Sequence, residues 1–259
     1  MSEPRAAASA VHRAALFLGL WLVVAALAHP SWDQPPVWDT TMGLFPAAQV
    51  LAENGFDLGD LLARPSWEGG GPNLHPFSIV TWGTALVLRL VDGPAAFAWL
   101  HAIQYAIGAG LGVLLFRLAR PALGAGGAGA VVGLLWLFPL ARVQLGYLYT
   151  ELPLAFATTG AVLAFVERRM RAAALWAGLA CAIKETGVVV PVALGVAAAL
   201  ERAPAARRAG RMAAWLAIPA VVVALQVAVV LPSRVGESGS GRPYLDQIAD
   251  AFLKLGLLP

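Results

Sequence analysis

Apolar residues in this chain gather in long runs that are separated by short polar segments. Seven runs have the composition of membrane-spanning helices: Ala14–Ala28, Ala95–Phe116, Ala122–Ala141, Leu152–Val166, Ala172–Ile183, Thr186–Leu200 and Met212–Leu231. Several are shorter than the roughly 20 residues that a bilayer normally requires, so their boundaries are approximate. An eighth run, Pro76–Val91, either crosses the membrane or lies in its interface. The pattern predicts an all-α, polytopic transmembrane helical bundle.

The distribution of lysine and arginine decides how Pro76–Val91 is interpreted. With a cytoplasmic N-terminus and a non-crossing Pro76–Val91, 11 of the 18 basic residues fall inside and 7 outside. If the segment crosses, the split becomes 8 inside to 10 outside. Cytoplasmic loops carry the excess of positive charge, and the cluster Arg168-Arg169-Met170-Arg171 strengthens this preference. We therefore expect seven spans, one interfacial helix and a multi-pass protein of the inner or plasma membrane.

This topology divides the chain into a transmembrane module over residues 1–231 and an outer C-terminal segment over residues 232–259. Residues 29–94 form the first outer loop with its interfacial helices. Between the breakers Pro35-Pro36 and Gly69-Gly70-Gly71-Pro72, apolar residues recur at helical spacing, which predicts a helix over Thr40–Ala63. A loop of this length with its own helix is more often functional than idle.

The composition supports a membrane protein. Of the 259 residues, 59% are hydrophobic and only 13% are charged, against about 25% charged in a soluble domain. This balance excludes a soluble enzyme and a disordered chain. The single cysteine, Cys181, excludes an intramolecular disulfide. The net charge of +3 reflects arginine-rich cytoplasmic loops rather than nucleic-acid binding.

An ionisable side chain in an apolar stretch costs about 2.5–3.5 kcal/mol at mid-bilayer, so its presence requires a reason. Asp39 follows the first span and is either a general base or a helix N-cap. His75 either binds a substrate phosphate or sugar hydroxyl, or is a solvated loop residue. Glu151 begins a span, where it lines a site or complements the helix dipole. Tyr149, beside it, also fits an interfacial aromatic belt.

Lys184 interrupts an apolar stretch that extends from Ala172 to Leu200. A single span would bury Lys184 and Glu185 near its middle. We therefore expect two helices that meet at the outer face, with Gly187 easing the turn. A lysine held there suits a phosphate. The alternative is an ion pair with Glu185, although adjacent residues on a helix do not face each other.

The predicted topology brings the candidate residues to one outer face: Asp39, His75, Arg142, Tyr149, Glu151 and Lys184. Carboxylates and a cation beside lipid suit transfer of a group from a lipid-phosphate donor, in which a base deprotonates the acceptor and the cation neutralises the leaving phosphate. No cofactor is required. Asp39 and Glu151 also carry the oxygen ligands that a divalent cation prefers, but two carboxylates are too few to predict a metal site.

Four short motifs in this order resemble those of the type-C (GT-C) integral-membrane glycosyltransferases, in the branch of protein O-mannosyltransferases and aminoarabinose transferases. Trp38-Asp39 is similar to their loop Asp-Glu motif, His75-Pro76-Phe77 to Lys/Arg-Pro-Pro-Leu, Glu151-Leu152-Pro153-Leu154 to Asp-x-Pro-Leu, and Lys184-Glu185-Thr186-Gly187 to Thr-Lys-Gly. The resemblance covers about residues 10–200. The chain departs from the family at Thr40, where glutamate is frequent, and at Glu185, which follows the lysine.

The resemblance implies a seven-helix module that transfers a hexosyl or pentosyl group from a polyprenyl-phosphate-linked sugar to a glycan, lipid or protein acceptor on the outer face. It implies that Asp39 is the catalytic base and that Glu151 and Lys184 line the donor or acceptor site. Because family members continue with further spans, we expect this chain to be a truncated or split N-terminal module. The alternatives are a lipid-linked-sugar transporter or flippase-like protein, although paired inverted repeats are not evident, and an inactive assembly subunit.

Overall fold

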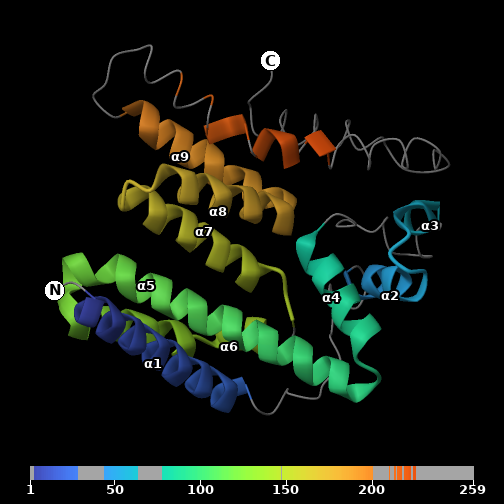
Figure 1. Ribbon diagram of the computed structural model, residues 1–259, viewed down its shortest axis with the longest axis horizontal. Coiled ribbons are helices and arrows are strands. Elements are labelled where there is room, and N and C mark those ends of the chain that lie inside the picture. The colour runs from blue at the N-terminus through green and yellow to red at the C-terminus, as the bar shows by residue number, and fades with distance from the viewer. Residues whose placement is uncertain are drawn as a thin grey trace.

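The computed structural model describes residues 3–28, 44–63, 78–146 and 148–200, together with short stretches between residues 210 and 225 (Figure 1). The elements in these ranges are all helices, as predicted: α1 (Glu3–Ala28), α2 (Phe45–Glu53), α3 (Leu58–Ala63), α4 (Ile79–Leu90), α5 (Pro94–Leu137), α6 (Pro139–Gly146), α7 (Glu151–Val166), α8 (Met170–Ile183), the 3-10 turn η3 (Glu185–Val188) and α9 (Val189–Leu200). The predicted outer segment 232–259 and half of the predicted span Met212–Leu231 lie outside the described residues.

Among the described helices, α5 alone is long and apolar enough to cross a membrane by length and composition. If α6 and α7 count as one broken span, they provide a second. The other apolar helices within the described ranges have 10–17 residues, which is below the roughly 20 that a straight crossing requires. The described residues therefore show a helical protein with at least one helix that fits a membrane, and they do not show seven spans.

The helix α5 contains a sharp bend at Gly124, which has φ 68° and ψ −179°. Glycine adopts a positive φ at little cost, and Pro121 three residues earlier cannot donate a helical hydrogen bond. The bend divides α5 into two arms that correspond to the predicted runs Ala95–Phe116 and Ala122–Ala141. The two runs do not form separate helices, because the helical backbone continues through the arginines between them, and the run predicted over Ala122–Ala141 ends in α6.

The two arms of α5 pack against each other through small residues on the first arm. A Cβ atom added to Gly108 would lie 3.2 Å from the ring of Trp136, and one added to Gly112 would lie 3.3 Å from Val132. Both contacts are tighter than ordinary van der Waals packing. Glycines four residues apart thus let the arms approach closely, as in helix pairs that pack within lipid.

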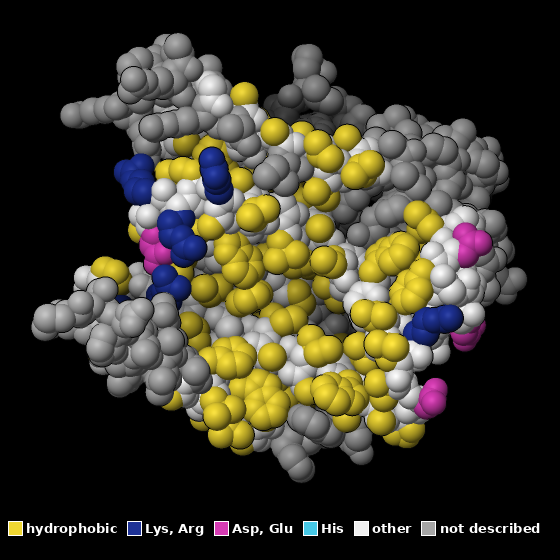
Figure 2. All heavy atoms as spheres, viewed as in Figure 1, with side chains coloured by type: hydrophobic (Ala, Val, Ile, Leu, Met, Phe, Trp, Pro, Cys, Tyr) yellow, Lys and Arg dark blue, Asp and Glu magenta, His cyan; other side chains and the backbone are white. Residues whose placement is uncertain are grey.

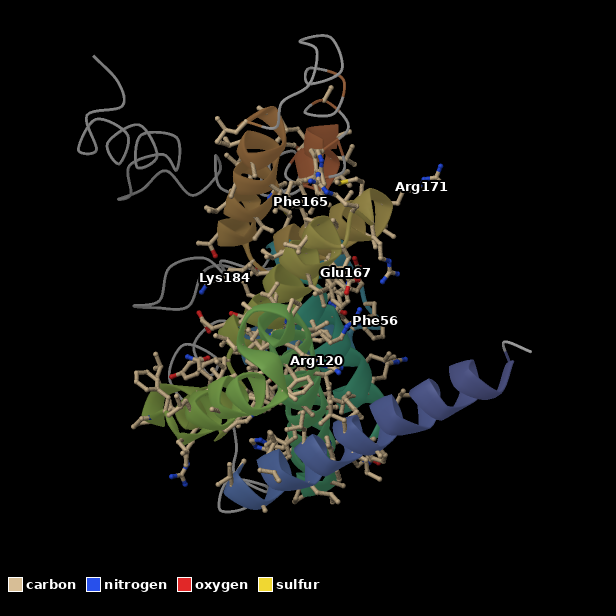
Figure 3. All side chains as sticks on the ribbon, turned by 90° about the vertical axis from the view of Figure 1, so that its left-hand side faces the viewer. Phe56, Arg120, Phe165, Glu167, Arg171 and Lys184 are labelled. Carbon is tan, nitrogen blue, oxygen red and sulfur yellow. The ribbon has the colours of Figure 1, made fainter. Side chains whose placement is uncertain are left out.

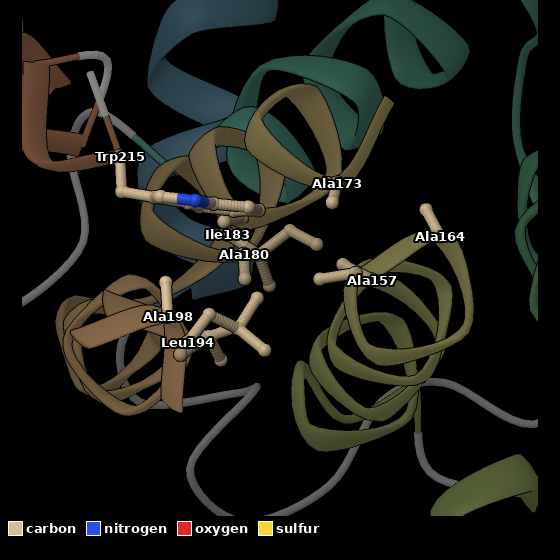
Figure 4. Close-up of a cluster of buried hydrophobic side chains, with 11 residues drawn as sticks. Ala157, Ala164, Ala173, Ala180, Ile183, Leu194, Ala198 and Trp215 are labelled. Carbon is tan, nitrogen blue, oxygen red and sulfur yellow. The ribbon is translucent and has the colours of Figure 1, made fainter. Parts of the chain in front are cut away.

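The helices α7, α8 and α9 lie side by side and form a second part of the bundle (Figure 1). Their shared core is rich in alanine and is closed at one side by Trp215 (Figure 4). A Cβ atom on Gly160 of α7 would lie 2.6 Å from the ring of Trp176 on α8. Small side chains therefore set the short distance between these helices.

The helices α2, α3 and α4 form a smaller unit beside the bundle (Figure 1). The single helix predicted over Thr40–Ala63 is wrong, because α2 and α3 are separated by a turn. Gly55 and Phe56 both have positive φ values, 73° and 69°. The turn is closed by Asn54, whose Oδ1 accepts from the N–H of Asp57 at 3.0 Å and whose Nδ2 donates to the carbonyl of Asp57 at 3.0 Å. Such asparagine turns compete with helix continuation.

Two ion pairs mark opposite ends of α7. At its C-terminal end, Arg117 of α5 donates to Glu167 at 2.6 Å. At its N-terminal end, Glu151 pairs with Lys184. The 16 residues of α7 make it about 24 Å long, so the two pairs are separated by most of the thickness of a bilayer core.

Candidate functional site

The ion pair between Lys184 and Glu151 is the centre of the candidate site. Lys184 Nζ donates to Glu151 Oε1 at 2.5 Å, across 33 residues of sequence. The Lys184 side chain is 25% exposed and that of Glu151 is 45% exposed. In Figure 3, Lys184 lies apart from Glu167 and Arg171. Two of the predicted site residues are therefore brought together, at the end of the bundle away from the Arg117–Glu167 pair.

The break between α8 and α9 positions Lys184. The helix α8 ends at Ile183, and Lys184 is extended, with φ −156° and ψ 148°. The turn η3 follows, in which the N–H of Gly187 donates to the Lys184 carbonyl at 2.8 Å. A Cβ atom on Gly187 would overlap the backbone carbonyl of Ala180. The prediction of two helices that meet at Lys184 is confirmed, and glycine is required because backbone lies against backbone.

Glu151 is the first residue of α7 and precedes the predicted span Leu152–Val166. Partial burial raises the pKa of this carboxyl group, while the hydrogen bond and the charge of Lys184 lower it. The lowering is the stronger effect overall, so the group is ionised at neutral pH. A carboxylate in the first turn also complements the positive end of the helix dipole. Glu151 thus holds the Lys184 side chain at this end of the bundle.

An apolar cavity of about 270 Å³ opens next to this ion pair. Its walls come from α2, α4, α5, α7 and α8, and its lining is hydrophobic apart from Thr84 and Gln104. Pro153, two residues after Glu151, and Ile183, immediately before Lys184, both line it. The volume is slightly below the range for ligand pockets, about 300–1,000 Å³. The cavity is thus lined by sequence neighbours of both members of the ion pair, an arrangement that suits a ligand with a charged head and a hydrocarbon chain.

Gln104 is a residue of this site that the sequence interpretation missed. It is 5% exposed on the first arm of α5 and lines the cavity. Its Nε2 donates to the carbonyls of Gln144 at 3.1 Å and Tyr149 at 3.0 Å. These hydrogen bonds hold the segment between α6 and α7 against α5, and they thereby position the start of α7 at Glu151. The available signal was a lone amide within the apolar run Ala95–Phe116.

Ser78 is a second residue that the sequence interpretation missed. It is 2% exposed and is the N-cap of α4, where its Oγ accepts from the N–H of Val80 at 3.3 Å. The same hydroxyl donates to the carbonyl of Ile183 at 2.6 Å. Ser78 thereby attaches α4 to the last residue of α8, directly before Lys184. The signal was a serine near the start of the apolar run Pro76–Val91, directly before Ile79, and serine is typical of an N-cap.

The other predicted site residues stand in different positions. Tyr149 contributes its carbonyl to the Gln104 network, and Arg142 is exposed on α6, two residues before Gln144. Asp39 and His75 lie outside the described residues. Within the described ranges, no three or more His, Cys, Asp or Glu side chains are grouped to hold a metal ion.

One face of the described part of the molecule is largely apolar. Figure 2 shows a face that is largely hydrophobic, with charged side chains mainly towards its edges.

No protein-family model matches the chain, and no curated protein or solved structure matches it. The geometry of the site is therefore the basis on which a function can be assigned.

Proposed function

We propose that this chain is the membrane-embedded module of a glycosyltransferase that uses a polyprenyl-phosphate-linked sugar on the outer face of the membrane. The observation that carries the proposal is the Lys184–Glu151 pair, whose sequence neighbours Ile183 and Pro153 line the apolar cavity. The cavity accepts the first part of the isoprenoid chain, and the ammonium group of Lys184 binds the phosphate. An ammonium ion has three N–H donors, and its bond to Glu151 uses one of them.

The reaction that fits this arrangement is displacement at the anomeric carbon of the donor sugar. Asp39, the candidate base, accepts the proton of an acceptor hydroxyl, and the acceptor oxygen forms a bond to the anomeric carbon. The bond from that carbon to the phosphate oxygen breaks, and the electron pair leaves with polyprenyl phosphate. Lys184 offsets the negative charge that develops on the leaving phosphate. The acceptor is a hydroxyl-bearing glycan, lipid or protein.

The proposal includes a multi-pass topology with seven spans and a cytoplasmic N-terminus. The Arg117–Glu167 contact supports it, because the bend of α5 and the α7–α8 turn were both predicted on the cytoplasmic side and meet at one end of the bundle. Lys184, predicted outside, lies at the opposite end of α7. Accessibility of single cysteines introduced at Arg120 and Arg142 to a membrane-impermeant thiol reagent tests this directly. Labelling of both from the same side would contradict the topology.

Lipid binding is tested by native mass spectrometry of the purified protein with polyprenyl phosphate and with a polyprenol of the same length. We expect the wild type to retain the phosphate more strongly, and Lys184→Ala to lose that preference by at least about tenfold, because a hydrogen bond to a charged group contributes about 1.5–3 kcal/mol. Lys184→Arg retains the charge and is the matched control. Equal retention of polyprenyl phosphate by the wild type and Lys184→Ala would remove the phosphate role of Lys184.

The cavity is tested separately by filling it. Gly83 lines the cavity, and a Cβ atom there would meet nothing within 4 Å, so a side chain can be started at this position without a clash at its Cβ atom, as in Gly83→Leu. Gly133 on the second arm of α5 is equally open and does not line the cavity, which makes Gly133→Leu the matched control. We expect Gly83→Leu alone to weaken retention of both polyprenyl compounds. If the two variants behave alike, the chain does not occupy this cavity.

Catalysis is tested with Asp39→Asn in membranes that contain the native lipid-linked donors. We expect sugar transfer to be abolished while retention of polyprenyl phosphate stays close to that of the wild type. If transfer continues, Asp39 is not the base. If the wild type retains polyprenyl phosphate but transfers no sugar, a lipid-binding assembly subunit is the better description.

A further inference from the structure

A second charged region lies at the end of the bundle opposite to Lys184. Five exposed arginines come from two segments that are distant in sequence, namely Arg117 and Arg120 before the bend of α5 and Arg168, Arg169 and Arg171 at the α7–α8 turn. Figure 2 shows basic side chains gathered around an acidic one along one edge of the molecule. We refer to these five arginines as the basic end.

Glu167 connects the two segments of the basic end. Its Oε1 accepts from Arg117 at 2.6 Å, and its Oε2 lies 3.6 Å from Arg169. One carboxylate therefore fixes the α5 segment against the α7–α8 turn, and five arginines minus one glutamate leave a net charge of +4 among these six residues. Arginine presents a planar set of donors that matches phosphate oxygens in pairs.

Apolar side chains border the basic end. Val166 immediately before Glu167 is 61% exposed, Leu123 on the α5 bend is 55% exposed, and Leu175, one helical turn after Arg171, is 67% exposed. Water contacts these side chains unfavourably, whereas hydrocarbon chains would cover them. A surface that combines phosphate-binding cations with exposed apolar residues is complementary to an anionic amphiphile.

We propose that the basic end binds the headgroup of an anionic phospholipid in the cytoplasmic leaflet, with the acyl chains against Val166 and Leu175. This inference goes beyond the transferase reaction, and it requires a membrane location but not glycosyltransferase activity. Charge complementarity decides the occupant, because basic groups between helices at the cytoplasmic side attract anionic headgroups. The bound lipid bridges the α5 bend and the α7–α8 turn and holds them together.

The experiment compares phosphatidylglycerol with phosphatidylcholine of identical acyl chains, added to the purified protein and counted as bound lipids by native mass spectrometry. We expect the wild type to retain phosphatidylglycerol preferentially. The double variant Arg168→Gln/Arg171→Gln spares the Arg117–Glu167 contact and should weaken retention by about fivefold for each arginine removed, roughly 25-fold together. Arg142→Gln removes one exposed charge at the other end and is the control.

Three results would overturn the proposal: equal retention of both lipids by the wild type, no loss in the double variant, or the same loss in Arg142→Gln. Arg168→Lys/Arg171→Lys keeps both charges and should retain most of the binding, which separates a charge effect from a folding defect. Inorganic phosphate added in excess should leave the phosphatidylglycerol bound. If inorganic phosphate displaces phosphatidylglycerol, the basic end is a site for free phosphate instead.

The two lipid sites are distinguishable in the same samples. Lys184→Ala should lose polyprenyl phosphate and keep phosphatidylglycerol. The double variant Arg168→Gln/Arg171→Gln should lose phosphatidylglycerol and keep polyprenyl phosphate. Loss of both lipids in either variant would indicate a general change in the protein and would contradict a separate anionic-lipid site.

Discussion

Replacement of Gly187 by alanine tests the turn that positions Lys184. An added Cβ atom would overlap the carbonyl of Ala180 and would lie 2.7 Å from the N atom of Cys181, where real Cβ contacts are essentially never shorter than 3.0 Å. Both partners are backbone atoms, so no flexible side chain can move away. Either η3 or the last turn of α8 must shift. Overpacking of this kind costs about 1–3 kcal/mol.

For a domain of 150–250 residues, each kcal/mol lowers Tm by about 2–4 °C, so we expect Gly187→Ala to lower Tm by roughly 2–12 °C. Thermal unfolding in mild detergent, followed by tryptophan fluorescence, measures this shift. Gly195→Ala is the matched control, because Gly195 is buried in α9 and an added Cβ atom meets nothing within 4 Å. Alanine should leave Tm unchanged or raise it there. A Tm for Gly187→Ala equal to that of the wild type would refute the close approach of η3 to α8.

Further predictions concern the contacts around the cavity. Ser78→Ala should lower Tm by an amount equivalent to about 0.5–2 kcal/mol, because it removes the N-cap of α4 and the bond to the Ile183 carbonyl; an unchanged Tm would mean that this attachment contributes nothing. Gln104→Leu leaves two carbonyls without their donor, at a cost of about 1–3 kcal/mol. Hydrogen exchange between α6 and α7 should then become faster, and unaltered exchange would exclude the anchoring role. Burial opposes a lowered pKa for Glu151 and Lys184 favours it, and the pKa is lowered overall. The ionised Glu151 therefore contributes its full stabilisation of the fold above the ordinary carboxyl pKa, and this stabilisation is lost as the pH falls through the lowered pKa. The difference in Tm between wild type and Glu151→Gln should therefore shrink on acidification, and a difference that does not depend on pH would contradict this.

The elements next to the site could be predicted because their signals are local. The apolar run after Glu151 predicted α7, and the charges at Lys184 followed by Gly187 predicted the break between α8 and α9. The helix predicted over Thr40–Ala63 was wrong because the hydrophobic spacing continues through Asn54-Gly55, where the backbone turns. Hydrophobic periodicity shows which face of a helix is apolar, but it does not reveal a single residue that has a positive φ.

The candidate site depended on contacts between residues that are distant in sequence. The partner of Lys184 lies 33 residues earlier, and the hydroxyl of Ser78 reaches a carbonyl 105 residues later. The predicted topology placed Glu151 and Lys184 on the same side of the membrane, but it did not predict that they form an ion pair. Gln104 was missed because its amide serves two backbone carbonyls, and such a role leaves no motif.

The sequence alone was sufficient for the helical class, the order of the apolar segments and the two ends at which charges gather, because hydrophobic runs and charged residues act over one helical turn or one loop. The Lys184–Glu151 pair, the cavity beside it and the Arg117–Glu167 contact required the tertiary structure. These features depend on how closely neighbouring helices approach, and that distance is set by glycine and alanine contacts between helices, such as Gly160 against Trp176, rather than by any local pattern.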